Sequence, residues 1–518
     1  MYLYLLLSFT LVAASLAIEP PTTPPFIHPR GTGGMVVACN NVVHSTLDYG
    51  MVEGIDGNPL NNMLAFNKAL KALQPCDTLH LPKGVYKTVG GIIGENLRNN
   101  TIIIDGTLEY NFNDYSVWPP SPPEPTKKFA DCISFMSCVD TVITSSEVGL
   151  GVLDGGGKPW WDKMILGQLP GPPGSSAGHD SRPKLLVVRD GVEMLVERLH
   201  LVNSPAWNFP FSAVRGEVRD INIEIDRDYQ RELKSRKVRA DSLKDRALMW
   251  LLDQLMGILP DWVLQPEDLN TDGIDPSGMD IYVHRVKVYN DDDSIAVKPS
   301  YKGSRIQGEA PFDCSQNILI ENSELVGFGA SIGSVGPKSG RPCVDGVTMR
   351  NITMPGTGKG IYVKSNGDDC NDPTHTSQLS NLLFEDFHIK NPWWYAVWIG
   401  PQEQNEPGEA LGLACALTYP IGNAQCPTQG CSDFRNITLR NILIENPKMS
   451  PGAILGNSTN PMQGIVFDNV KVKQKSLVLG RWPWKEDKYP WHGTYQSVAA
   501  PGTCINGCDP MPEGFTSQ

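Results

Sequence analysis

The sequence has no excess of positive charge. Its 44 Lys and Arg residues are outnumbered by 57 Asp and Glu residues, so the formal net charge is −13. Proteins that hold nucleic acid through its phosphates need a basic surface. We therefore expect no nucleic-acid partner. Charged residues make up only 19% of the chain and apolar residues 40%, which is the balance of a globular protein and excludes a disordered polyelectrolyte.

Long hydrophobic runs are also scarce. One run occupies residues 1–17 and ends in Ser15-Leu16-Ala17, the small-x-small pattern of a signal-peptide cleavage site. The run is shorter than the ~20 residues that cross a bilayer. We predict a signal peptide at 1–17, a secreted protein and no membrane contact after cleavage. Because the run contains no Lys or Arg, a retained membrane anchor is the alternative.

Cysteines at metal-binding spacing are missing. The chain has 12 cysteines, and Cys504 and Cys508 come nearest to such spacing, without a second pair. In a secreted chain this even number predicts several disulfides, including a short Cys504–Cys508 loop, and no metal site. Four N-x-Ser/Thr sequons, at Asn99, Asn351, Asn436 and Asn457, fit secretion.

A repeated β-rich phrase dominates what is present. It alternates Val, Ile or Leu with Arg, Glu or Asn, and its copies lie at 192–201, 279–288, 316–325, 344–353, 379–388, 434–443 and 462–471. Alternation within a copy predicts a strand, and recurrence every 20 to 50 residues predicts a solenoid. We predict an all-β fold, a single-stranded right-handed parallel β-helix over 49–518, in one monomeric catalytic domain.

Three segments differ from this repeat. Residues 18–48 are rich in Pro, Thr and Gly, which predicts a leader segment. Apolar residues three and four apart predict a helix over 61–73. Residues 226–259 carry many charges and then a run of helix formers. We predict a helical insertion that packs on the solenoid, or alternatively overhangs the substrate groove.

Two acidic segments lie about one coil apart. Asn270-Thr271-Asp272 is followed by Asp291-Asp292-Asp293. Stacked strands are ~4.8 Å apart, and each residue of offset adds ~3.3 Å. We therefore expect the carboxylates to converge on one outward face, near the lower end of the ~6.5–9.5 Å separation of inverting glycosidases. The spacing fits turn-forming or calcium-binding residues equally well.

The neighbouring motifs resemble glycoside hydrolase family 28, the polygalacturonase family, with its N-T-D, D-D, G-H-G and R-I-K motifs. Further supporting phrases are at 151–162, 203–208 and 327–336. The resemblance covers about 45–475 and implies hydrolysis of a pectic polysaccharide without a cofactor. It also implies that Asp292 is the general acid, while Asp272 and Asp293 hold and deprotonate the attacking water.

Two positions depart from the family motifs. Phe328 replaces the His of G-H-G, and Tyr362 replaces the Arg of R-I-K, while Lys364 is retained. An Arg binds a carboxylate through two bonds and Tyr cannot. We expect Asn270, Lys364, Tyr362 and Phe328 to bind substrate, with a neutral sugar stacked on Tyr362. Rhamnogalacturonan hydrolases of the family are similar in lacking both residues, and so would a variant that has lost activity.

Other candidates carry less weight. Trp160-Trp161 and Trp393-Trp394-Tyr395 could be sugar platforms, but we favour core positions, and His284 is expected to face outward from a strand. Two other functions remain open: a β-helix polysaccharide lyase that uses Ca²⁺, and a carbohydrate-binding β-helix without activity.

Overall fold

The computed structural model describes residues 20–28, 41–110, 115–121, 129–169, 181–233, 269–300, 314–337, 340–366, 374–393, 395–402, 429–447, 451–473, 495–498 and 500–518. The predicted signal peptide and residues 234–259 of the predicted insertion lie outside these ranges.

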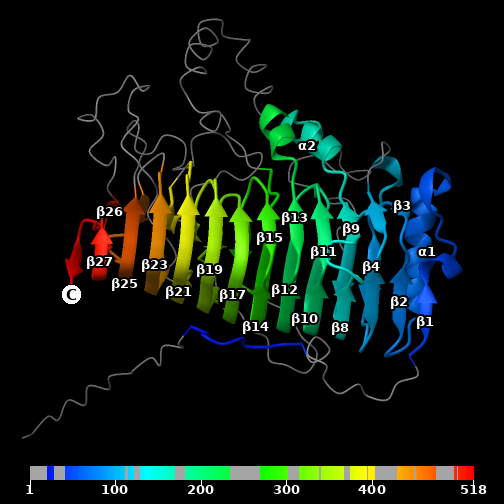
Figure 1. Ribbon diagram of the computed structural model, residues 1–518, viewed down its shortest axis with the longest axis horizontal. Coiled ribbons are helices and arrows are strands. Elements are labelled where there is room, and N and C mark those ends of the chain that lie inside the picture. The colour runs from blue at the N-terminus through cyan, green and yellow to red at the C-terminus, as the bar shows by residue number, and fades with distance from the viewer. Residues whose placement is uncertain are drawn as a thin grey trace, which may run out of the picture.

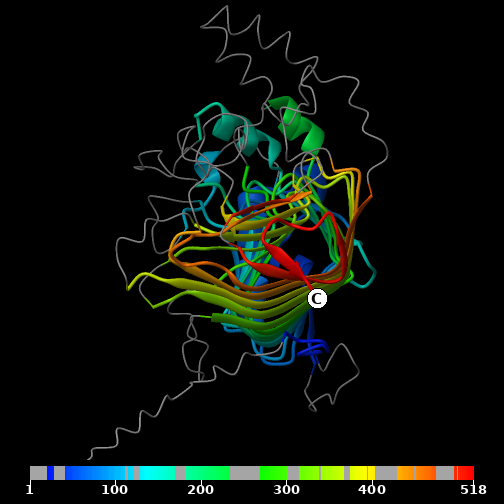
Figure 2. The same cartoon turned by 90° about the vertical axis from the view of Figure 1, so that its left-hand side faces the viewer.

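The strands wind into a parallel β-helix, as predicted (Figure 1). Seen along its axis, the coils stack into one tube (Figure 2). Three parallel ladders form its walls. The first contains β1 (Val43–Ser45), β2 (Thr78–Leu81), β5 (Thr101–Ile104), β8 (Val139–Thr144), β10 (Leu186–Glu197), β12 (Phe209–Arg219), β14 (Ile274–His284), β17 (Cys314–Val326), β19 (Cys343–Pro355), β21 (Ser377–Lys390), β23 (Ser432–Glu445), β25 (Gln463–Lys473), β27 (Gly502–Asp509) and β28 (Phe515–Ser517).

The other two ladders complete each coil. The second contains β3 (Val85–Lys87), β6 (Thr107–Glu109), β9 (Gly151–Asp154), β11 (Leu199–Val202), β13 (Asn222–Glu224) and β15 (Lys287–Tyr289), and it continues into β17. The third contains β4 (Ile92–Glu95), β7 (Ile133–Met136), the first parts of β10, β12 and β14, and then β16 (Ile295–Val297), β18 (Ala330–Val335), β20 (Ile361–Ser365), β22 (Val397–Pro401), β24 (Gly452–Leu455) and β26 (Gln496–Val498).

Alternating side chains build the core. In β23 the residues Ile437, Leu439 and Ile442 are buried among the stacked apolar side chains, while Arg435 is exposed. Full burial of such a side chain stabilises the fold by about 1.5–3 kcal/mol. Because every coil adds its own apolar row, the repeat that identifies the fold also supplies its cohesion.

The asparagines of the repeated phrase turn the chain. Asn351, Asn436, Asn441 and Asn469 have φ between 52° and 55°, in the left-handed region that asparagine tolerates better than most residues. Some of these side chains bond from coil to coil: the Asn436 amide donates to Asn381, and the Asn469 amide to Asn441. The same asparagines therefore form the turn within a coil and hold neighbouring coils together.

Helices add to the β-helix at two places. The predicted N-terminal helix is α1 (Pro59–Ala72), which begins after the Asn58 cap, buries Phe66 and lies at the N-terminal end of the coils (Figure 1). The second helix, α2 (Lys158–Ile165), buries Trp160 and Trp161. These two tryptophans are core residues, as we favoured. Residues 227–233 are also helical and begin the predicted insertion.

Part of the predicted leader segment contacts the sheet. Strand β1 lies within it, and residues 20–28 run along the outside of the coils (Figure 1). The main-chain N–H of His28 donates to Glu217, which also contacts His284 at 3.0 Å. His284 faces away from the core, as expected from the strand alternation, yet it is buried, with 4% of its surface exposed.

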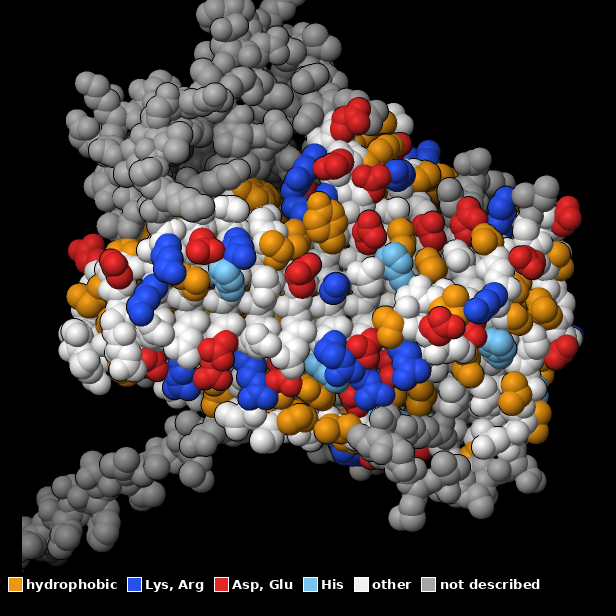
Figure 3. Space-filling model, viewed as in Figure 1, with side chains coloured by type: hydrophobic (Ala, Val, Ile, Leu, Met, Phe, Trp, Pro, Cys, Tyr) orange, Lys and Arg blue, Asp and Glu red, His pale blue; other side chains and the backbone are white. Residues whose placement is uncertain are grey.

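Charged side chains cover the outer wall of the coils. Figure 3 shows acidic and basic groups interleaved in a band across the strands. Pairs such as Arg440–Asp468 and Arg350–Glu321 join neighbouring coils. Disulfides join Cys314 to Cys343, and Cys504 to Cys508 as predicted. Among the described residues, no helix is long and apolar enough to cross a membrane.

Candidate active site

Three predicted carboxylates come from two consecutive coils of the third ladder. Asp272 directly precedes β14, while Asp292 and Asp293 precede β16. Because Ile274 pairs with Ile295, Asp272 lies beside Asp293 in the register. The main chain agrees with this, since Gly273 donates its N–H to the Asp293 carbonyl. The coil length places these residues together.

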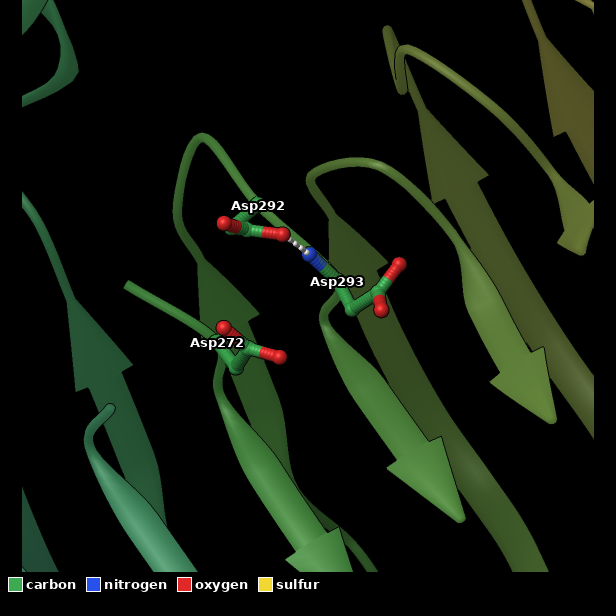
Figure 4. A group of neighbouring side chains, drawn as sticks. All are labelled: Asp272, Asp292 and Asp293. Atoms are coloured by element: carbon green, nitrogen blue, oxygen red, sulfur yellow. Dashed lines mark hydrogen bonds between the residues drawn. The ribbon is translucent and has the colours of Figure 1, made fainter. Parts of the chain in front are cut away.

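The three side chains lie close together just before two neighbouring strands, with the Asp293 carboxyl turned away from Asp292 (Figure 4). One oxygen from each of Asp272, Asp292 and Asp293 lies within 4.8 Å of the others. This is a distance between nearest oxygens, whereas the ~6.5–9.5 Å range is a separation between whole carboxyl groups. In the turn before β16, the Asp293 N–H donates to Asp292 at 2.7 Å, which holds the Asp292 carboxyl close to Asp293. Strand spacing, which measures Cα positions, does not predict that contact.

Asp293 is held from two sides. The Lys364 ammonium lies 2.6 Å from its Oδ2 atom, and the Ser331 hydroxyl donates to its Oδ1 atom at 2.7 Å. All three side chains are buried. An ammonium this close compensates for burial of the carboxylate. Lys364, a predicted substrate-binding residue, therefore contacts a predicted catalytic acid.

Asp272 has an unusual ionisation. Its pKa is raised to about 6, chiefly because burial removes hydration from the charged form. The Asp293 charge contributes to this rise, and the Lys298 and Lys364 charges limit it. The Lys298 ammonium lies 3.5 Å from Asp272 Oδ2. Asp272 can therefore change its protonation state in weakly acidic solution.

A stability prediction follows from this pKa. The folded protein holds a proton on Asp272 between the ordinary pKa of 3.8 and about 6, so ionisation costs stability as the pH rises through this window. The full cost is about 2–3 kcal/mol. Asp272→Asn removes this cost. The free energy of unfolding of the variant, relative to that of the unmutated protein, should therefore be higher by about 2–3 kcal/mol at pH 7.5 than at pH 4. Urea unfolding at both pH values measures it, with the exposed Asp56→Asn as control. An equal effect of Asp272→Asn at both pH values would contradict the assignment.

The adjacent Asp291 belongs to a different set of contacts. Its Oδ1 atom accepts from Arg227 at 3.3 Å and from Arg231 at 3.0 Å. Both arginines lie in the helical residues 227–233. Asp291 thus anchors the start of the predicted insertion, and Asp292 and Asp293 are the pair that faces Asp272.

The predicted substrate-binding residues have unequal positions. Tyr362 has 0% of its surface exposed and packs with Trp393, Tyr395 and Trp398. Our expectation that a sugar stacks on Tyr362 is therefore wrong, because aromatic rings from later coils already cover it. Trp393 and Tyr395 are buried, as we favoured.

Phe328 and Asn270 lie at the edges of the site. Phe328 is half-buried, and its ring meets Trp393 edge-on, with centroids 5.1 Å apart. Asn270 is half-buried with a φ of 46°, so it turns the chain toward Asp272. Within the described part of the chain, no hydrogen bond joins the Asn270 side chain to the three acids.

Sequence reasoning missed Lys298, Ser331 and Asp275. Lys298 contacts Asp272, and Ser331 contacts Asp293. Asp275 is buried three residues after Asp272. The register would have identified them. Ser331 pairs with Ala296 of the preceding coil. Because Ile274 pairs with Ile295, Asp275 lies beside Ala296 on its other side and faces outward.

Comparisons with known proteins agree with the site motifs. The family model for glycosyl hydrolases family 28 matches residues 76–479. A probable endo-xylogalacturonan hydrolase A from Aspergillus niger is 26% identical over 337 residues, covering 63% of this chain and 64% of the relative. Endopolygalacturonase D from Aspergillus niger is 27% identical, covering 54% and 44%. The matches thus span less than two thirds of the length of these relatives.

Solved structures support the fold. The endo-xylogalacturonan hydrolase from Aspergillus tubingensis aligns with a TM-score of 0.53 at 19% identity, covering 92% of this chain and 99% of that one. The Yersinia enterocolitica family 28 exopolygalacturonase aligns with a TM-score of 0.57 at 13% identity, covering 93% and 78%. With the family model matching most of the sequence, this chain belongs to glycosyl hydrolases family 28.

Proposed function

We propose that the protein is a secreted glycoside hydrolase that cleaves a galacturonic-acid-containing pectic polysaccharide by single displacement with inversion. The observation that carries this proposal is the convergence of Asp272, Asp292 and Asp293, whose nearest carboxylate oxygens all lie within 4.8 Å of one another. Family membership supports the reaction class. The names of its relatives, endo-xylogalacturonan hydrolase and endopolygalacturonase, support the substrate class.

Each acid has a role that its contacts support. Asp292 protonates the glycosidic oxygen as the sugar leaves. Asp293 and Asp272 lie side by side and orient one water molecule, and Asp272 accepts a proton from this water as it attacks. One Asp293 oxygen accepts from the Ser331 hydroxyl and the other lies 2.6 Å from the Lys364 ammonium, so the carboxylate is poorly placed to attack carbon itself. This favours direct attack by water over a covalent sugar–enzyme intermediate.

The charge balance of the cluster supports hydrolysis without a metal. Three neighbouring carboxylates have the spacing to hold a cation. Lys364 and Lys298, however, contact Asp293 and Asp272 and supply positive charge at the same place. We propose that these two ammonium groups take the part that a divalent ion would play.

Product analysis separates this proposal from a lyase. Hydrolysis of galacturonan, xylogalacturonan or rhamnogalacturonan should release reducing ends without ultraviolet-absorbing unsaturated sugars, and EDTA should leave the rate unchanged. Unsaturated products that depend on Ca²⁺ would identify a lyase. Binding of all three polymers without any cleavage would identify a carbohydrate-binding protein.

The pH profile tests the role of Asp272. As a base, Asp272 must be ionised, so kcat/KM should rise with pH up to about 6. Lys298 favours the ionised form, and Lys298→Met should therefore move this acid limb to higher pH and lower activity more at pH 5 than at pH 8. Rates across pH 4–9 measure the shift. If kcat/KM instead fell as the pH rose through 6, and Lys298→Met shifted the pH of that fall, Asp272 would be the general acid.

A further inference from the structure

A second group of side chains lies beside the acids, toward the N-terminus. Phe209 pairs with Ile274 in the register, so Trp207 lies beside Asp272 on the preceding coil. The main-chain bonds show the same two coils side by side, because the N–H of Asn208 donates to the Asp272 carbonyl at 2.9 Å. The Trp207 indole is only half-buried, so part of it remains available next to the catalytic cluster.

Two ammonium groups approach this indole. Lys184 Nζ lies 4.0 Å from the ring centroid of Trp207, and Lys298 Nζ lies 5.5 Å from it. Lys184 comes from the coil before Trp207, since the N–H of the next residue, Leu185, donates to the Trp207 carbonyl. Lys298 comes from a later coil, and its N–H donates to the Pro276 carbonyl. Positive charge thus reaches this ring from both directions along the solenoid, from one coil before Trp207 and from two coils after it.

A buried carboxyl group without a hydrogen bond completes the group. Asp275 is 3% exposed, and neither of its carboxyl oxygens has a hydrogen-bond partner among the described residues. Because Ile274 faces the core, the next side chain along the strand, Asp275, faces outward. Asp275 pairs in the register with Pro210, which lies on the same coil as Trp207. Lys184 and Lys298 are both close enough to lower its pKa, although burial raises it overall. Leaving such a group without a partner is costly, and a ligand hydroxyl would satisfy it.

The other side of the acids has a different character. Phe328 follows Asp293 in the register, and Lys359 follows Phe328. Lys359 is 1% exposed and lies 4.1 Å from the ring centroid of Tyr362, which is itself fully buried. That side is a packed aromatic cluster, so the Trp207 side is better suited to an anionic sugar.

We propose that Trp207, Lys184, Lys298 and Asp275 form a subsite for a uronic-acid unit of the polysaccharide, adjacent to the bond that is cut. This inference rests on the proposed function. The sugar ring packs against the exposed part of the indole beside the ammonium groups, its carboxylate lies between those two groups, and a ring hydroxyl bonds to Asp275. The subsite supplies the recognition of charge that Phe328 and Tyr362 cannot provide.

The test compares charged and neutral polymers. On galacturonan, Lys184→Gln should raise KM about tenfold and change kcat less than twofold. On the same polymer after full methyl esterification, the effect on KM should be less than twofold. Lys163→Gln is the matched control, because Lys163 of α2 also approaches an aromatic ring, 5.2 Å from the centroid of Tyr115. Trp207→Ala should weaken binding of both polymers, and Trp207→Phe should restore most of it.

Binding gives a readout that does not depend on turnover. In calorimetric titration with a galacturonic acid oligomer, the Asp292→Asn protein should bind about tenfold more tightly than the same protein with Lys184→Gln added. Equal binding, or an equal effect of Lys184→Gln on charged and esterified polymers, would overturn the subsite. Absence of cleavage by the unmutated protein would instead overturn the proposed function and leave this binding result to decide the subsite.

Discussion

Replacing Asp292 with asparagine is expected to lower kcat by at least a factor of about 10³ while leaving the fold unchanged. The amide keeps the shape of the side chain and an oxygen that can accept from the Asp293 N–H, but it has no carboxyl proton to give to the leaving sugar. General acid–base catalysis contributes about 10²–10⁴ in rate. Release of reducing ends measures the loss, and thermal unfolding verifies the fold.

The neighbouring Asp291 provides the matched control. Asp291→Asn is expected to keep kcat within about tenfold of the unmutated value and to lower stability instead, because Asp291 contacts Arg227 and Arg231. If Asp291→Asn abolished turnover and Asp292→Asn did not, the acid would be one residue earlier than we propose.

Replacing Lys364 with methionine is expected to cost about 3–5 kcal/mol of stability. The substitution removes the ammonium 2.6 Å from Asp293 and leaves a fully buried carboxylate with the Ser331 hydroxyl bond but without that opposite charge. Activity should fall as well, because Asp293 loses the contact that orients it. Urea unfolding at pH 7 measures the stability, and reducing-end release measures the activity.

A second substitution separates the two effects. Adding Asp293→Asn to the Lys364→Met protein removes the buried charge, so several kcal/mol of stability should return while activity stays lost. A double variant no more stable than Lys364→Met alone would show that packing of the lysine stem against Tyr362, whose ring centroid lies 4.4 Å from Nζ, causes the loss.

The sequence repeat was sufficient to predict the β-helix and the meeting of the acids. Both follow from periodicity: alternation fixes which side chains face out, and coil length fixes which of them become neighbours. Asp272 and Asp293 are adjacent for that reason. Lys298 and Ser331 were equally accessible to this reasoning once the register was known.

Other features depend on contacts that periodicity does not encode. Tyr362 is buried because Trp393, Tyr395 and Trp398 gather over it, and no local pattern around residue 362 signals those partners. The close approach of the three carboxylates depends on the turn before β16. The contact of residues 20–28 with Glu217 joins segments that are far apart in the sequence and share no motif.

The anomeric configuration of the first product tests the central claim most directly. Direct attack by water inverts the configuration and a covalent sugar–enzyme intermediate retains it, so this measurement separates the two routes at the site where Asp272, Asp292 and Asp293 meet. Proton NMR during the first minutes of cleavage should show a new reducing end with the configuration opposite to that of the bond cut. Retention of configuration would contradict direct attack by a water molecule held between Asp272 and Asp293.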